Sequence, residues 1–117
     1  MKVNLYALLI TLLIFGCGDG TKTSYHENGQ KKSEATYKDG KLEGLFTEWY
    51  ENGLKKMEDK YKDGTIDGIS TYWYENGQKM LELNYKGGKQ DGFTISYNED
   101  GTEKSRSLFK NGKMVED

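Results

Sequence analysis

The stretch that decides the fold runs from Trp49-Tyr50-Glu51-Asn52-Gly53 through Tyr61-Lys62-Asp63-Gly64 to Gly68. It recurs along the chain, and the first glycine of each unit marks the period of 24 residues: Gly29, Gly53, Gly77 and Gly101. Self-similarity at this length is typical of a repeat array, in which each unit covers the apolar surface of its neighbour. The sequence therefore predicts one elongated domain of four equivalent units.

Each unit carries two turn signals, Glu51-Asn52-Gly53 and Lys62-Asp63-Gly64 in the clearest copy. Asn or Asp before Gly, between strand-like runs, is a strong sign of a β-hairpin because glycine adopts positive φ without steric cost. A two-residue loop and a three-residue loop ending in a glycine bulge both fit. We predict an all-β fold, a single antiparallel meander of roughly seven or eight strands with no helix after the N-terminal segment.

The distribution of side chains between the two faces favours the three-residue loops, because successive strand residues point to opposite faces and paired residues share one. These loops predict three pairs in the central unit: Tyr50 with Leu54, Thr47 with Met57, and Tyr61 with Thr65. Odd-numbered positions would then share a mainly apolar face, and even-numbered positions a charged face. Three further glycines fall within or at the start of strands, where we expect local twist or close backbone approach: Gly44, Gly68 and Gly92.

The composition is polar, with 34% apolar and 31% charged residues, so a large buried core is not expected. Stability should instead come from contacts between neighbouring hairpins. Disorder is the alternative for so polar a chain, but nine tyrosines, two tryptophans and four phenylalanines at regular positions argue against it. A net charge of -2 gives no electrostatic basis for binding nucleic acid.

The N-terminal segment has the layout of a secretory signal. Lys2 forms a short basic end, and the run from Leu5 to Phe15 is almost wholly apolar before polar residues begin at Gly18. A membrane-spanning helix needs about 20 residues, so this apolar run is too short to span a bilayer. An ordinary signal peptide and an uncleaved anchor helix are the alternatives to the interpretation that follows.

The end of the apolar run, Ile14-Phe15-Gly16-Cys17, resembles the lipobox of bacterial lipoproteins. The resemblance implies cleavage before Cys17, diacylglyceryl transfer to its sulfur and acylation of the new amine; several acyl chains would hold the protein firmly on a membrane. The expected organisation is a signal peptide (residues 1–16), a lipidated Cys17 with a tether (residues 17–24) and a repeat domain (residues 25–117). The expected location is the bacterial cell envelope, periplasmic or surface-exposed. A single cysteine permits neither an internal disulfide nor a cysteine metal cluster.

The motif Tyr50-Glu51-Asn52-Gly53, followed by Tyr61-Lys62-Asp63-Gly64 and Asp67-Gly68, resembles the MORN repeat in its bacterial variant form. The resemblance covers residues 25–115. It implies an extended sheet of stacked hairpins that serves as a binding or scaffolding surface. Bacterial proteins with this variant repeat are often named as antitoxin-like components of toxin–antitoxin systems, and others in the wider family associate with membranes or phospholipids.

The residues give little support for catalysis, a metal site or a cofactor. His26 is the only histidine, and its repeat equivalents are Tyr50, Tyr74 and Asn98, so a surface strand residue is favoured over a general base. No nucleophile stands beside a base. Acidic pairs such as Asp63 and Asp67 have the spacing of turn residues and lack the dense ligand set of a calcium loop.

Four aromatic residues on the even-numbered face form the candidate partner-binding site: Phe46, Tyr50, Tyr72 and Tyr74. Aromatic side chains on a polar face suit the binding of a peptide, a glycan or another protein. A terminal strand that is not capped could also pair with a partner's strand. The expected function is a protein-interaction or scaffolding module, anchored to the membrane through Cys17 and binding a protein partner. The alternative is an antitoxin-like component that binds and neutralises a toxin.

Overall fold

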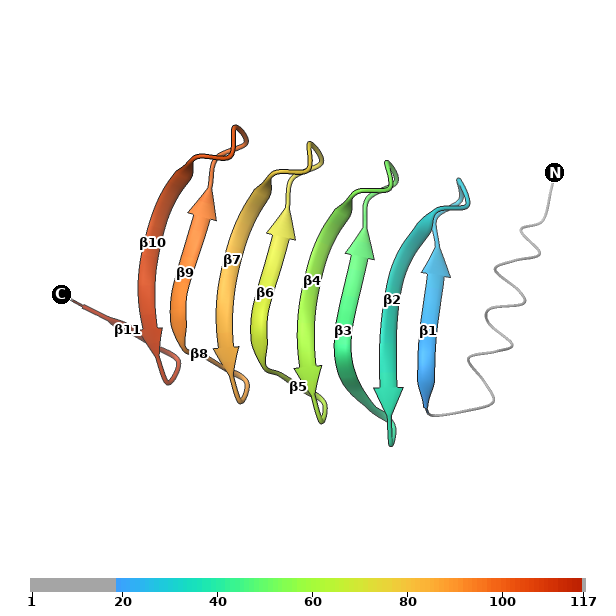
Figure 1. Cartoon of the computed structure of the whole chain (residues 1–117), viewed down its shortest axis with the longest axis horizontal. Helices are drawn as coiled ribbons and strands as arrows, with labels where there is room; N and C mark the ends of the chain where they lie inside the picture. The colour runs from blue at the N-terminus through green and yellow to red at the C-terminus, as the bar shows by residue number, and fades with distance from the viewer. Residues whose placement is uncertain (1–18, 117) are drawn as a thin grey trace.

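A computed structural model describes residues 19–116 as one open antiparallel sheet. The sheet is a single layer, with extents of 57 × 36 × 14 Å (Figure 1). Within these residues there is no helix, and therefore none with the length and apolar character needed to cross a membrane. The predicted signal peptide, residues 1–16, and Cys17 lie outside the described residues.

The strands follow one another across the sheet in chain order (Figure 1). They are β1 Gly20–Tyr25, β2 Lys31–Lys38, β3 Lys41–Trp49, β4 Lys55–Lys62, β5 Thr65–Ile66, β6 Gly68–Trp73, β7 Lys79–Lys86, β8 Lys89–Gln90, β9 Gly92–Tyr97, β10 Glu103–Lys110 and β11 Lys113–Val115. The short strands β5 and β8 pair with β4 and β7 and lie off the main path. The all-β meander is confirmed, with more strands than expected. Because β1 begins at Gly20, within the predicted tether (residues 17–24), the sheet begins before residue 25.

The hairpins close at one edge through residues 26–30, 50–54, 74–78 and 98–102, which we call the upper loops (Figure 1). In the second of them the Tyr50 N–H donates to the Leu54 carbonyl at 2.9 Å, and Gly53 has a φ of 87°. This is a three-residue loop with a terminal glycine bulge, as predicted. A bulge beside the loop then shifts the register, so that Thr47 pairs with Glu58 and not with Met57 as predicted.

At the opposite edge the lower turns, residues 39–40, 63–64, 87–88 and 111–112, contain two residues each. Tyr61 pairs with Ile66, so the predicted pairing of Tyr61 with Thr65 is wrong. The physical reason is that Asp63 adopts a φ of 48° and Gly64 a φ of 81°. Positive φ at both positions is what a type I′ hairpin turn requires, and its twist matches that of the strands.

The upper bulges and the two-residue lower turns together place odd-numbered residues opposite even-numbered ones. The predicted division into an odd and an even face is therefore wrong. Thr47, Glu58 and Thr71 share one side of the sheet, the first face. Met57 and Tyr61, which we expected beside Thr47, lie on the second face.

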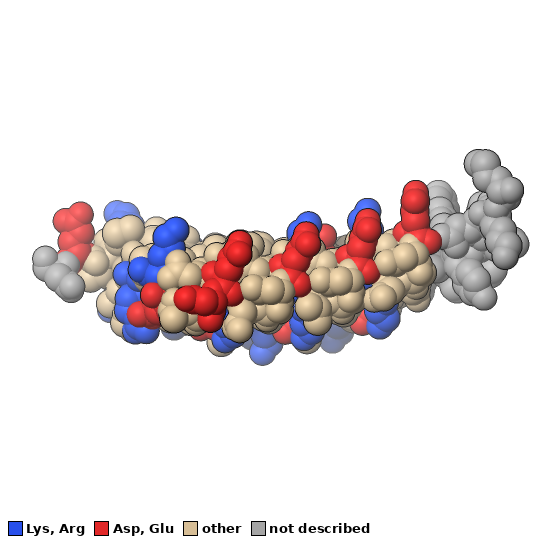
Figure 2. Space-filling view, turned by 90° about the horizontal axis from the view of Figure 1, so that it is seen from above, with Lys and Arg blue, Asp and Glu red and all other residues tan. Residues whose placement is uncertain are grey.

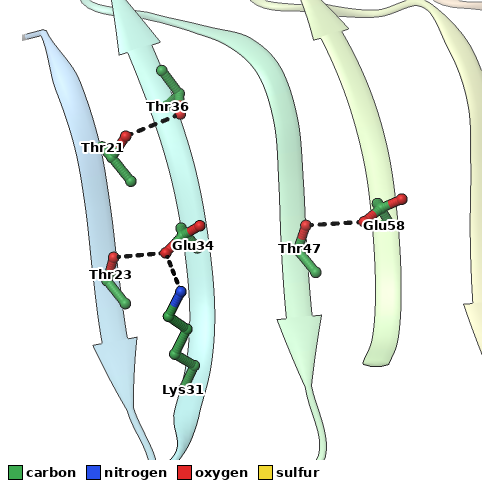
Figure 3. A network of polar contacts seen from close by, with 7 residues as sticks. All are labelled: Thr21, Thr23, Lys31, Glu34, Thr36, Thr47 and Glu58. Atoms are coloured by element: carbon green, nitrogen blue, oxygen red, sulfur yellow. Dashed lines mark hydrogen bonds and ion pairs between the residues drawn. The ribbon is translucent and has the colours of Figure 1, made fainter. Parts of the chain in front are cut away.

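Threonine and glutamate alternate in a row across the first face (Figure 3). The Thr23 hydroxyl donates to the Glu34 carboxylate at 3.2 Å, and Thr47 donates to Glu58 at 3.4 Å. Each glutamate in this row also forms an ion pair with the lysine three residues before it: Lys31–Glu34, Lys55–Glu58 and Lys79–Glu82. Exposed ion pairs contribute little to stability, so the hydrogen bonds that join neighbouring strands matter more here.

On the second face each recurrent aromatic residue lies opposite a glycine of the neighbouring strand. Tyr61 pairs with Gly44, and Tyr85 with Gly68, whose φ of 115° is one that other residues rarely adopt. An aromatic side chain opposite a strand glycine covers backbone that the glycine leaves open. The buried apolar side chains of the described residues are only Ala35 and Met57, so the sheet has no conventional core.

Candidate interaction surface

Each upper loop is tied to the next one by an aromatic or imidazole side chain at its first position. The Tyr50 hydroxyl donates to the Trp73 carbonyl at 2.6 Å, and Tyr74 makes the equivalent bond to the Tyr97 carbonyl at 2.7 Å. In the first loop the His26 Nε2 takes this place, 2.8 Å from a backbone carbonyl of the next unit. His26 is thus a structural residue that links two units.

The loop asparagine uses both ends of its amide. The Asn52 Oδ1 accepts from the Leu54 N–H at 2.9 Å, and its Nδ2 donates to the Glu75 carbonyl at 2.9 Å. Asn28 and Asn76 make the same two contacts in their own units. The asparagine therefore closes its own turn and holds the next one. In the last loop the position is Asp100, whose carboxylate accepts from Thr102 but carries no donor.

Acidic side chains connect the lower turns in a similar way. The Glu43 carboxylate accepts the Asp63 N–H at 2.7 Å, and Asp67 accepts the Gly87 N–H at 3.2 Å. These acidic side chains therefore stabilise the turns, as the sequence predicted. Across residues 19–116 no three His, Cys, Asp or Glu side chains cluster in a way that could hold a metal ion.

The four predicted partner-binding residues form two separate pairs and not one site on a single face. Phe46 and Tyr72 lie half-buried on the second face, paired across strands with Asp59 and Met57. The Asp59 carboxylate is buried and accepts a hydrogen bond from the Ser70 hydroxyl. Burial raises the pKa of Tyr72, and the negative charge of Asp59 adds to the effect.

The other pair, Tyr50 and Tyr74, lies at the upper loops, half-buried and with both hydroxyls engaged in the bonds described above. Their rings line two shallow grooves between neighbouring loops. We call these the Lys56 groove, of about 460 Å³, and the Met80 groove, of about 450 Å³, after a residue that differs between them. The Met80 groove repeats the Lys56 groove one unit further along the chain.

Two glutamates line each groove. Glu51 and Glu75 line the Lys56 groove, and Glu75 and Glu99 line the Met80 groove. Figure 2 looks onto this edge and shows acidic side chains at regular intervals along it. Burial raises the pKa of the Tyr50 hydroxyl, and the Glu75 charge adds to the rise. The Met80 groove, with two glutamates and no basic residue in its lining, is therefore electronegative, whereas Lys56 offsets one of the two negative charges in the Lys56 groove.

Sequence reasoning did not identify the grooves, although a signal for them was present. The loop glutamates recur at the repeat spacing, at Glu27, Glu51, Glu75 and Glu99, and all four are exposed. A second feature that the sequence analysis did not single out lies on the first face. Four apolar side chains in one row across the first face are between 39 and 53% exposed: Leu45, Ile69, Phe93 and Leu108. Lys60 and Asn84 belong to the same row, paired with Leu45 and Ile69.

The model of one protein family, the MORN repeat variant, matches residues 18–39, 42–63 and 66–86, which together make up more than half of the chain. The chain belongs to the MORN repeat variant family. Each matched MORN repeat is one hairpin with its upper loop. The fourth hairpin lies beyond the matched MORN repeats but keeps the loop bond, from the Asn98 N–H to the Thr102 carbonyl at 2.8 Å. No curated protein and no solved structure shows significant similarity to the chain.

Proposed function

We propose that this MORN repeat protein is a lipid-anchored protein of the bacterial cell envelope whose sheet serves as a protein-interaction module. The observation that carries the proposal is the line of exposed apolar side chains on the first face, Leu45, Ile69, Phe93 and Leu108. Aligned apolar side chains on the surface of a soluble domain are typical of a protein-binding surface. They gain the free energy of burial when a partner covers them.

The repeat architecture supports the same role. The loop side chains hold neighbouring units together, which leaves the faces free to differ from unit to unit. The anchor would also set the position of the sheet. Because only two residues, Gly18 and Asp19, separate Cys17 from Gly20 at the start of β1, an acylated Cys17 would hold β1 within about 10 Å of the membrane surface.

The binding surface can be tested with the double variant Ile69→Lys and Phe93→Lys. We expect it to lose envelope proteins that co-purify with the wild-type chain after crosslinking, while the circular dichroism spectrum stays the same. Met114→Lys is the matched control, because Met114 is an exposed apolar residue of β11 that pairs with Phe109 on the second face. Co-purification that survives in the double variant would rule out the first face as the binding surface.

The location is tested by the intact mass of the protein from the membrane fraction, beside a Cys17→Ala variant. A chain that begins at Cys17 and carries acyl groups, absent from the variant, is the expected result. A full-length, unacylated chain in the cytoplasm would refute the envelope location. It would also place the antitoxin-like alternative first, although no feature of residues 19–116 favours that alternative.

A further inference from the structure

The Lys56 groove contains a cation that belongs to the chain itself. The Lys56 Nζ lies 5.8 Å from the centroid of the Tyr50 ring, within the range of a cation–π interaction. Glu51 and Glu75 line the same groove. The groove between two upper loops is therefore a place where an ammonium group lies over a tyrosine, next to two carboxylates.

The Met80 groove has the equivalent tyrosine and glutamates without the cation; Tyr50 stands there in place of His26, and Trp49 has no counterpart in its lining. Tyr74 takes the place of Tyr50, and Glu75 and Glu99 take the places of the two glutamates. Met80 stands where the previous unit has Lys56. No lysine or arginine among residues 19–116 lies over the Tyr74 ring, whereas the Tyr50 ring has Lys56.

We infer that the Met80 groove binds a lysine or arginine side chain from an extended basic segment of the protein partner. The inference rests on the proposed function and names the chemistry of the partner. The Tyr74 ring and the two carboxylates attract the cationic head, and the Met80 side chain contacts the aliphatic stem. A protein segment is favoured over a free cation because the groove is open and shallow, so that a lone ion would stay largely hydrated there.

The spacing of the loops specifies the sequence of that segment. Equivalent grooves are two strands apart, which is about 9.6 Å across a sheet. Three residues of an extended chain in the polyproline II conformation rise about 9.3 Å, and with three residues per turn every third side chain points to the same side. A segment with a cation at every third position therefore matches successive grooves, but in this chain Lys56 already occupies one of them. Replacing Lys56 by methionine would open a second groove in register with the first.

The test uses the full-length chain in a neutral detergent, with methionine methyl groups labelled for NMR. The probe is the acetylated and amidated peptide Thr-Lys-Thr-Thr-Lys-Thr-Thr-Lys-Thr, and the same peptide with glutamine for lysine is the control. We expect the Met80 methyl signal to shift with the lysine peptide only. The signals of Met57, on the second face, and Met114, in β11, are expected to stay in place.

Two substitutions make the test sharper. Met80→Lys should lower the affinity for the lysine peptide about tenfold, because the new lysine would occupy the groove as Lys56 occupies its own. The fold should tolerate it, since the neighbouring unit carries lysine at this position. Lys56→Met should raise the affinity for the lysine peptide, because two of its lysines could then bind two grooves at once. A peptide of equal charge whose three lysines are adjacent should gain less.

A pair of charge variants distinguishes binding in the Met80 groove from non-specific attraction of the basic peptide to the acidic protein. Glu99→Gln and Asp39→Asn each remove one negative charge, the first at the Met80 groove and the second at a lower turn. Only Glu99→Gln should weaken binding of the lysine peptide. Equal weakening by both variants, or unchanged binding by Met80→Lys, would overturn the inference. An envelope partner that is lost from the Ile69 and Phe93 variant but retained by Met80→Lys would also overturn it, while the proposed function would stand.

Discussion

At the scale of single residues, the sheet is held together by side chains that contact two units at once. Asn52 closes its own loop with one end of its amide and holds the next loop with the other. Tyr50 reaches the neighbouring backbone with its hydroxyl. Because only Ala35 and Met57 are buried apolar residues in the described chain, these polar contacts carry more of the stability than they would beside a conventional core.

Asn52→Asp should therefore destabilise the fold. The aspartate keeps the oxygen that accepts from Leu54 but loses the donor to the Glu75 carbonyl, at a cost of about 0.5–1.5 kcal/mol in the free energy of unfolding. Urea denaturation measures the change. The matched control is Asp100→Asn, which makes the reverse exchange where no further loop follows. A loss of the same size in the control would show that the bond between loops is not the cause.

Tyrosine ionisation should make the fold sensitive to alkaline pH. Burial raises the pKa values of Tyr50, Tyr61 and Tyr72 above their ordinary value of 10.0. A group whose pKa is higher in the folded state contributes stability that is fully present below its unfolded pKa and is lost as the pH rises through its folded pKa. Urea midpoints should therefore fall above pH 10, and less steeply in Tyr72→Phe. Identical pH profiles for the variant and the wild type would contradict this assignment.

At the scale of the elements, the lower turns decide how one hairpin follows another. Asp39, Asp63 and Asn111 all adopt positive φ at the first turn position, with values of 51°, 48° and 51°. The third turn has Gly87 there, with a φ of 56°. Three of the four turns thus use a residue that tolerates this conformation and has fewer unfolded conformations than glycine.

Gly87→Asn should stabilise the protein by about 0.4–1 kcal/mol, because it lowers the entropy of the unfolded chain without straining the folded one. A Cβ built at Gly87 meets no atom within 4 Å, and the N–H that bonds to Asp67 is retained. Thermal or urea denaturation provides the measurement. Gly87→Val serves as the contrasting variant, since a β-branched residue at positive φ is strained and should destabilise the turn. Destabilisation by both residues alike would refute the argument.

The same elements show how far the sequence determines the fold. The repeat and its turn residues were sufficient to predict the meander and the closure of Tyr50 with Leu54. They were insufficient for the pairing of Thr47 with Glu58, because hydrophobic alternation specifies register only where one face is buried. In a single-layer sheet both faces remain partly exposed, so neither the bulge nor the two-residue lower turn leaves a hydrophobic signature.

The sequence likewise predicts only part of the structure of the candidate sites. The repeat spacing located Tyr50 and Tyr74, but it could not show that their hydroxyls bond to the backbone of the following unit. The Lys56 and Met80 grooves form only after neighbouring loops have stacked, so their walls come from residues of different units. A single unit, considered alone, does not contain such a groove.

At the scale of the whole molecule, spatial order follows chain order, and each hairpin meets only its neighbours (Figure 1). Deleting one unit, residues 50–73, would join Trp49 to Tyr74 and bring β3 beside β7 in the place that β6 holds now. In such quasi-one-dimensional folds, stability is roughly the sum of unit and interface contributions. The shortened chain should therefore fold with reduced stability.

The measurement for this deletion is the far-ultraviolet circular dichroism spectrum together with urea denaturation. The control removes half a unit, residues 50–61, which deletes a loop and most of β4. This shorter deletion joins strands that run in the same direction, and an antiparallel sheet cannot accommodate that junction without a crossover. Cooperative unfolding of the half-unit variant, or none for the full-unit variant, would contradict the independence of the units.

The aspartate in the last loop has a consequence for self-assembly. A repeat array whose two ends are complementary, as successive units are, can add further copies head to tail and grow into a filament. The first loop presents the backbone carbonyls to which a preceding unit would bond, but Asp100 offers no amide hydrogen to a following copy. Replacing one nitrogen by an oxygen at this position removes the donor that would join the last loop to the first loop of another copy. The chain thus disfavours its own polymerisation while every internal junction keeps the full set of bonds.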